Sequence, residues 1–396
     1  MRVKQARLEV RRDGAKNCAV PCAEIDTATH APAATELPLN ALEHQLTYPW
    51  SDVPAPGTVI TLRPGMHWLR MGLPFALDHI NLWLLDDEID GVSGFTAIDC
   101  GITSDATMAA WERLFDTVFG GKPLLRVIAT HFHPDHVGLA HWLTAGGREH
   151  RWRAPLWMSA AEYAYARFLS AGQGDLSGDG AVKHFRRHGL TDPESLAKVR
   201  ARGSGYYPKL VPAVPTSYVR INDGDALTIG GRTFKAITGF GHSVEHVSLY
   251  CESARVLVSG DMVLPRISTN VAVFDLEPEA DPLPRYLRSL DRYLPLPADT
   301  LVLPSHGKPF TGLHTRVMQQ HAHHAARLAE VQAACTRPMS AADIVPVLFK
   351  RELDLHQLTF ALGESLAHLH ALWYDGRLRR SRGDDGVYRF VAVAAR

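Results

Sequence analysis

Short runs of alternating apolar and polar residues recur along the chain, separated by segments with a helical period. The first β-type runs cover residues 59–62, 67–71, 80–85 and 95–99, and a helical pattern follows at residues 108–119. A period of two is typical of strands, and a period near 3.6 of amphipathic helices. Because this alternation continues to about residue 310, we predict an α/β fold of sheets covered by helices.

Three segments depart from this alternation. Residues 1–40 mix Ala, Thr, Pro and charged residues without a sustained period, which predicts a disordered extension. Within a main domain at residues 41–335, residues 160–215 form a largely helical insertion that becomes irregular near Tyr206. Residues 336–396 form a further domain, in which two helical patterns precede a β-hairpin pattern.

The composition is that of an ordinary globular protein, with 46% hydrophobic and 21% charged residues. The 42 Lys and Arg residues balance 42 Asp and Glu residues, so no bulk charge draws the chain to nucleic acid or to an acidic membrane. Five scattered cysteines indicate free thiols and a reducing compartment. The start of the chain has no signal-type apolar region and no 18-residue apolar run occurs, so we expect a cytoplasmic protein that does not span a membrane.

The most informative motif is Thr130-His131-Phe132-His133-Pro134-Asp135-His136, which follows a strand-like run at residues 124–129. In an extended chain alternate side chains share one face, so His131 and His133 would point the same way. Asp135 and His136 fall at the turn into a helix, where their side chains can bind at a position next to that of His131 and His133. Four potential ligands in six residues therefore favour two adjacent cations over one.

The spacing His131-x-His133-x-Asp135-His136 resembles the signature of the metallo-β-lactamase superfamily of hydrolases. Three later motifs follow in the family's order, each after a strand-like run: Gly241-His242-Ser243, Ser259-Gly260-Asp261 and Pro304-Ser305-His306-Gly307. Asp99 matches the early aspartate that family members place beneath the metals. The resemblance covers roughly residues 55–315 and implies a four-layer αββα sandwich with metals at one edge. The tail resembles the small winged-helix domain of a subgroup that is related to glyoxalase II and includes the mitochondrial β-lactamase-like endoribonuclease.

The resemblance implies a ligand set for each of two metal ions. One would take His131, His133 and His242, the other would take Asp135, His136 and His306, and Asp261 would bridge the two. These nitrogen and oxygen donors suit zinc first, with iron or manganese as alternatives. Asp135 would also orient the shared hydroxide, and Asp99 would hold a ligand imidazole from behind, so both are candidate catalytic residues.

Other chemistries are compatible with parts of the pattern. His242-Ser243-Val244-Glu245-His246 has the H-x-x-E-H spacing of inverted zincins. Two glycines precede it and a β-favouring run follows it, which disfavours the helix that this motif needs. We therefore interpret His246 as a residue behind or beside the ligands. A one-iron dioxygenase would retain the same ligand positions, and a catalytically silent metal-binding protein is the alternative from a different class.

We expect hydrolysis of a small acyl substrate, namely a thioester, a lactone or another ester. A phosphodiesterase or endoribonuclease acting on RNA is the main alternative, supported by the winged-helix-like tail and by Arg266 close to Asp261. β-Lactam hydrolysis ranks third because no export signal is seen. The insertion is expected to cover the metal centre, and the candidate substrate contacts are Tyr206, Tyr207, Lys209, Arg266 and His246. Tails of this kind also serve in dimerisation, so a homodimer is a further expectation.

Overall fold

The computed structural model describes residues 42–172, 178–203 and 205–393. The described residues of Asn40–Arg396 form one compact unit. The predicted extension at residues 1–40 lies outside the described residues. Cys100, Cys251 and Cys335 are buried free thiols. Within the described part of the chain, no helix has both the length and the apolar character that crossing a bilayer requires.

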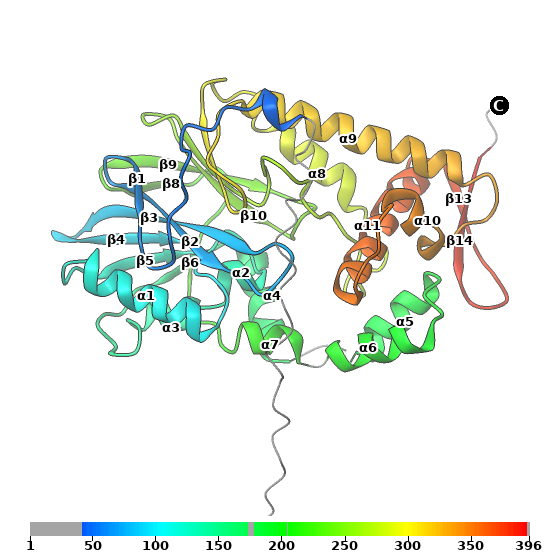
Figure 1. Cartoon of the computed structure of the whole chain (residues 1–396), viewed down its shortest axis with the longest axis horizontal. Helices are drawn as coiled ribbons and strands as arrows, with labels where there is room; N and C mark the ends of the chain where they lie inside the picture. Colours follow the sequence, from blue (N-terminus) through cyan, green and yellow to red (C-terminus); the bar gives the residue numbers. More distant parts are fainter. Residues whose placement is uncertain (1–41, 173–177, 204, 394–396) are drawn as a thin grey trace, which may run out of the picture. The chain divides into compact units, whose positions relative to one another are not determined.

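Two sheets form the centre of this unit (Figure 1). The first has seven strands in sequence order: β1 (Ile60–Arg63), β2 (Met66–Gly72), β3 (His79–Ile89), β4 (Val92–Ile98), β5 (Leu124–Ile128), β6 (Leu156–Met158) and β7 (Val219–Arg220). It is antiparallel from β1 to β4 and parallel from β4 to β7. The short helix η1 (Glu43–Gln45) precedes it.

The second sheet has five strands in the order β12-β11-β10-β9-β8. They are β8 (Ala226–Ile229), β9 (Arg232–Gly239), β10 (His246–Cys251), β11 (Val256–Gly260) and β12 (Leu301–Pro304). Only the pair β11 and β12 is parallel among them. Every residue of β10, β11 and β12 is buried, because these strands are covered on both faces.

The packing order is helix, sheet, sheet, helix, which confirms the predicted sandwich. Successive residues of β3 illustrate it: Leu82 and Leu84 pack among the apolar residues of α1 (Asp105–Thr117) and α3 (Ala140–Thr144), whereas Trp83 and Leu85 face the second sheet. The outer face of the second sheet packs against α8 (Pro282–Asp291) and α9 (Leu313–Ala334). The ends of the strands of both sheets lie between the two outer layers of helices.

The C-terminal segment has the predicted order of two helices and a hairpin. These are α10 (Ala341–Leu348), α11 (Leu355–Tyr374), β13 (Leu378–Arg382) and β14 (Tyr388–Ala392). Reciprocal hydrogen bonds between Ser340 and Asp343 and between Asp354 and Gln357 fix the starts of the two helices. The description of this segment as a winged helix stays a prediction.

The insertion divides into helices that pack in different places, and its expected role as a cover over the candidate metal centre stays a prediction. It contains α4 (Ala160–Ser170), α5 (Asp179–Arg187), α6 (Pro193–Gly203) and α7 (Tyr206–Leu210). Apolar residues of α5 and α6, including Phe185 and Leu196, belong to the same core as Leu366 of α11. Helices α4 and α7 hydrogen-bond to the loop that carries His131 and His133, and Val182 of α5 shares a core with Val273 of the loop that follows Asp261.

Candidate metal centre

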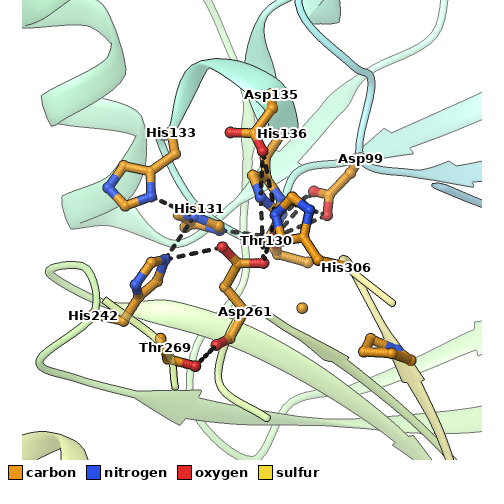
Figure 2. Close-up of polar contacts among 12 residues, drawn as sticks. Asp99, Thr130, His131, His133, Asp135, His136, His242, Asp261, Thr269 and His306 are labelled. Carbon is orange, nitrogen blue, oxygen red and sulfur yellow. Dashed lines mark hydrogen bonds and ion pairs between the residues drawn. The ribbon is translucent and has the colours of Figure 1, made fainter. Parts of the chain in front are cut away.

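The seven predicted ligands lie together because the segments that carry them leave the two sheets at a shared edge (Figure 2). His131 and His133 follow β5, and the short helix α2 (Pro134–Val137) carries Asp135 and His136. The other three follow β9, β11 and β12, and they are His242, Asp261 and His306. Residues 241–245 have no helical structure, so the inverted-zincin interpretation is excluded.

The first group of ligand atoms comes from three histidines and one carboxylate. His131 Nε2 lies 2.9 Å from His133 Nδ1 and 3.2 Å from His242 Nε2. Asp261 Oδ2 lies 3.3 Å from His242 Nε2. Four donor atoms therefore converge on one point, as a bound cation requires.

The second group consists of Asp135, His136 and His306. Asp135 Oδ2 lies 3.6 Å from His136 Nε2 and 3.4 Å from His306 Nε2. The other oxygen of Asp261, Oδ1, lies 3.5 Å from both imidazole nitrogens. The two oxygens of Asp261 therefore face different groups, which is the arrangement of a bridging carboxylate.

Hydrogen bonds on the outer side orient three of the imidazoles. His242 Nδ1 donates to the carbonyl of Asn270 at 2.8 Å, and His306 Nδ1 donates to the carbonyl of His79 at 2.7 Å. His136 Nδ1 lies 2.8 Å from Asp99 Oδ2. Because a carbonyl can only accept, each Nε2 on the other side of the ring keeps its lone pair for a metal. The predicted contact from Asp99 to a ligand imidazole is thus present.

Asp99 occupies an unusual backbone position as well as this contact. Its φ of 62° lies in the left-handed region, which few non-glycine residues adopt. Its carboxylate also accepts hydrogen bonds from the backbone N–H of Thr130, at 2.8 Å, and from the Thr130 hydroxyl. Asp99 therefore holds both His136 and the start of the ligand loop, and the strain marks it as a constrained residue.

The electrostatics of the two groups suit cations. Burial, followed by the neighbouring imidazoles, lowers the pKa of His131 well below its usual range and that of His133 to about 3. Burial also opposes charge on His306, but Asp261 and Asp135 outweigh it and raise its pKa to about 10. His131 and His133 thus present neutral lone pairs, and the second group attracts positive charge.

Two atoms at the centre have no hydrogen-bond partner among the described residues. They are the buried His136 Nε2 and Asp261 Oδ1. Buried polar atoms are normally satisfied, and a cation between the two groups would satisfy both. The donor set therefore fits one divalent ion in each group, with nitrogen and oxygen ligands that zinc accepts.

Glu162 of α4 joins two ligand loops and was not identified from the sequence. It is fully buried, and burial raises the pKa of its carboxyl to about 6. Its Oε2 accepts a hydrogen bond from the N–H of Phe132 at 2.8 Å. Its Oε1 accepts from the Ser243 hydroxyl and the Glu245 N–H, both at 2.6 Å. One carboxylate thus ties the loop of His131 and His133 to the loop of His242.

Two of the predicted substrate contacts have structural roles instead. His246 is fully buried, and its Nε2 accepts a hydrogen bond from the N–H of Asp261 at 3.2 Å. A substrate cannot reach it, so the prediction of contact is wrong, whereas the position behind the ligands is confirmed. Tyr207 is buried and its hydroxyl donates to the carbonyl of Phe132, which holds the ligand loop rather than a substrate.

The other three predicted contacts are accessible. Lys209 is exposed and Tyr206 is half-buried, both on α7. Arg266 is exposed and pairs with Glu43 at 3.2 Å. Their roles toward a substrate stay predictions.

Comparisons with known proteins agree with this geometry. Residues 81–306 match the family described as the metallo-beta-lactamase superfamily, and residues 328–393 match the one described as metallo-beta-lactamase-like, C-terminal domain. The chain is 58% identical to a beta-lactamase domain protein from Burkholderia ambifaria, with a TM-score of 0.85 over 89% of this chain and 100% of that one.

Two more distant relatives cover similar lengths. A metallo-beta-lactamase family protein from Thermus thermophilus is 28% identical, with a TM-score of 0.68 over 84% of this chain and 100% of its own. The probable metallo-hydrolase YqjP of Bacillus subtilis (strain 168) is 24% identical over 315 residues, which are 77% of this chain and 91% of that protein. The likeness therefore extends beyond the ligand motifs to the C-terminal segment.

Proposed function

The chain belongs to the metallo-β-lactamase superfamily and is a metallo-hydrolase, and we propose that it uses two divalent metal ions, zinc first, to hydrolyse a small acyl substrate. The observation that carries the two-ion proposal is the position of Asp261. Its two oxygens face separate sets of ligands, each of which has three further donor atoms. A single ion would leave one set of buried donors unsatisfied.

Two bound ions would supply a nucleophilic hydroxide at neutral pH and would polarise the scissile carbonyl. Three residues of the chain would assist these two ions. Asp261 spans the two positions, Asp99 fixes the ring of His136, and Asp135 orients the attacking group. Asp135 suits the last task because its side chain is 19% exposed, against 0% for His136 and 3% for His306. It is the ligand of its group that a substrate can approach.

An aromatic rim beside the ligands supports an acyl substrate. Phe132 lies between His131 and His133 in the chain, and its ring centroid is 5.4 Å from that of Tyr165 on α4. The Tyr165 hydroxyl donates to Glu277 at 3.0 Å, in the loop that also carries Phe274. Phe274 is 39% exposed and its ring is 6.2 Å from that of Phe360 on α11. These contacts offer an apolar surface that suits a hydrocarbon acyl group.

The arginines of the hairpin give less support to the RNA alternative, because most of them are engaged within the chain. Arg380 pairs with Glu279 at 2.8 Å and lies 3.8 Å from the ring centroid of Trp373. Arg377 donates to Gln332. Nucleic-acid binding by this segment would need cations that are free to meet phosphates.

The test compares the hydrolysis of acyl thioesters and lactones with the cleavage of single-stranded RNA, using metal-loaded protein. We expect acyl turnover that falls at least about 100-fold in Asp135→Ala, since even residues behind a metal ligand cost 10- to 100-fold. Asp116→Ala, an exposed carboxylate on α1, serves as the matched control and should retain turnover. RNA cleavage that is lost in Asp135→Ala, together with inert thioesters and lactones, would reject the acyl proposal.

A further inference from the structure

A cleft lies between the insertion and the C-terminal hairpin, and it shares no residue with the candidate metal centre. It has a volume of about 320 Å³. Its walls come from α5, α6 and the hairpin of β13 and β14. Five cations line it: Lys183, Arg186, Arg187, Arg200 and Arg382.

The positive charge of this cleft is not balanced by its own carboxylates. Asp179 and Asp385 are the two acids that line it. Asp179 pairs with Arg200 at 2.9 Å, and Asp385 pairs with Arg389, outside the cleft, at 2.6 Å. Within the described ranges, Lys183, Arg186 and Arg187 form no ion pair. A chain that is neutral overall therefore concentrates uncompensated positive charge at one place.

The local structure holds these cations close together despite their repulsion. On α5, Val182 and Phe185 are buried in the core, so the helix cannot rotate its basic side away. Lys183, Arg186 and Arg187 are spaced i, i+3 and i+4, which places them on one exposed face. Like charges at this spacing destabilise a helix, and an anion bound between them would remove that cost.

The opposite wall contributes a guanidinium from a distant part of the sequence. Arg382 Nε donates to the carbonyl of Gly386 at 3.2 Å, which fixes the side chain across the hairpin turn. Its terminal amino groups make no hydrogen bond with a described residue. A planar guanidinium with free N–H groups is the side chain that binds phosphate oxygens most effectively.

We propose that this cleft binds a phosphate-bearing small molecule, in addition to the chemistry at the metal centre. Its volume is at the lower end for small-molecule sites, which suits a compact ligand with two or more phosphates. An RNA strand would need the basic surface to continue along the hairpin. It is interrupted there, because Arg377, Arg380 and Arg389 are bound to groups of the chain itself and only Arg379 and Arg382 are exposed without an ion pair to a described residue.

The test is calorimetric titration of the full, metal-loaded chain with inorganic pyrophosphate and with ADP. We expect one site per chain and at least a 10-fold loss of affinity in the double variant Lys183→Gln with Arg186→Gln. The control is Arg153→Gln with Arg220→Gln, which removes two exposed cations elsewhere and should leave the affinity unchanged. All four residues are exposed, so circular dichroism should show folded variants.

Three outcomes would overturn the proposal. The first is that neither probe binds to the wild-type chain. The second is binding that persists in the cleft variant and disappears in Asp261→Ala, since the phosphates would then occupy the metal centre. The third is a single-stranded RNA that binds through Lys183 and Arg186 while pyrophosphate and ADP do not. The metal content of the cleft variant is measured separately from these three outcomes. The proposed hydrolase function can therefore be rejected or supported independently of the cleft proposal.

Discussion

At the scale of single residues, Asp261 is held in place by its main chain. Its N–H donates to His246, and its carbonyl accepts from the Thr269 hydroxyl at 2.6 Å. The preceding Gly260 has a φ of 55°, and a Cβ there would lie 2.2 Å from His246 Nε2. Only glycine fits this position. The side chain of Asp261 is therefore free to address both groups of ligands while its backbone stays fixed.

Glu162→Gln tests how the two positions of the metal centre depend on the outer residues. The amide offers one acceptor where the carboxylate offers two, so it turns an N–H₂ group toward a donor. We expect the position of His131, His133 and His242 to bind zinc at least about 10-fold more weakly. The position of Asp135, His136 and His306 should be unchanged. Equilibrium dialysis with metal analysis measures both affinities.

The matched control for this variant is Glu112→Gln. Glu112 also accepts a hydrogen bond from a backbone N–H, that of Arg148, but on the far helix α1. It should bind as many ions per chain as the wild type, with unchanged affinities. Equal, unaltered binding in Glu162→Gln would show that the carboxylate does not position the ligand loop.

The sequence predicted the ligands themselves better than the residues behind them. All seven ligands belong to local motifs at strand ends, and the structure brings every one of them together. Glu162 gave no such signal. The spacing Ser159-x-x-Glu162 is that of a helix capping box, which would indicate a role at the start of a helix. In the structure Ser159 instead donates to the carbonyl of Glu245 at 2.7 Å. Contacts between residues about 80 positions apart are set by tertiary packing, which spacing alone cannot reveal.

At the scale of elements, α11 lies directly against the loop that orients His242. The N–H of Val273 donates to the carbonyl of Gly363 at 3.1 Å. A Cβ on Gly363 would lie 2.8 Å from the Cβ of Ala272. In the same loop, Asn270 accepts from His242 through its carbonyl and donates from its side chain to Glu364 at 3.5 Å. This close approach depends on the absence of a side chain at residue 363.

Gly363→Ala should therefore destabilise the protein, although alanine is the better helix former. Helix propensity alone would add about 1 kcal/mol, but the overpacked contact should cost about 1–3 kcal/mol beyond that gain. Urea unfolding measures the difference. Gly72→Ala is the control, since a Cβ at this strand residue meets no atom within 4 Å. A more stable Gly363→Ala would show that α11 can move away from the loop.

The patterns of single elements predicted helices and strands well and their partners poorly. The helices of the insertion were expected to act together at the metal centre. Helices α4 and α7 bond to the loop of His131 and His133, whereas α5 and α6 pack in the core that contains α11. An apolar stripe such as Val182 and Phe185 specifies that a helix face is buried, and any other apolar surface can bury it.

At the scale of the whole molecule, the chain contains 21 histidines, and several are buried far from the ligand motifs in sequence. Four of them contribute to a pH dependence of stability: His184, His188, His324 and His368. Burial lowers the pKa of each to between about 2 and about 4. The unfolded chain takes up these protons near pH 6.5, so stability should fall as the pH falls below that value.

His188→Phe tests this for one residue. Burial lowers the pKa of His188 to about 2, helped by His184, His370, Arg380 and Arg187, and its ring stacks on that of Tyr388 at 5.7 Å. Phenylalanine keeps the stacking and does not titrate. Between pH 6.5 and 5.5 the wild type should lose about 1 kcal/mol more free energy of unfolding than the variant.

Urea unfolding of metal-loaded protein at the two pH values measures this difference, and His141→Phe is the control. His141 is exposed on α3, so its replacement should leave the pH dependence as in the wild type. Equal losses in His188→Phe and the wild type would mean that His188 takes up a proton in the folded state.

The two contacts of Asn270 couple metal binding at His242 to the packing of α11. Because one residue touches both His242 and α11, an ion that immobilises His242 also favours the docked position of α11. Linkage is reciprocal, so a ligand whose affinity for α11 changes when the metal binds must change metal affinity by the same factor. A graft of this segment that removes the contact with Asn270 is therefore expected to alter metal occupancy without changing a ligand.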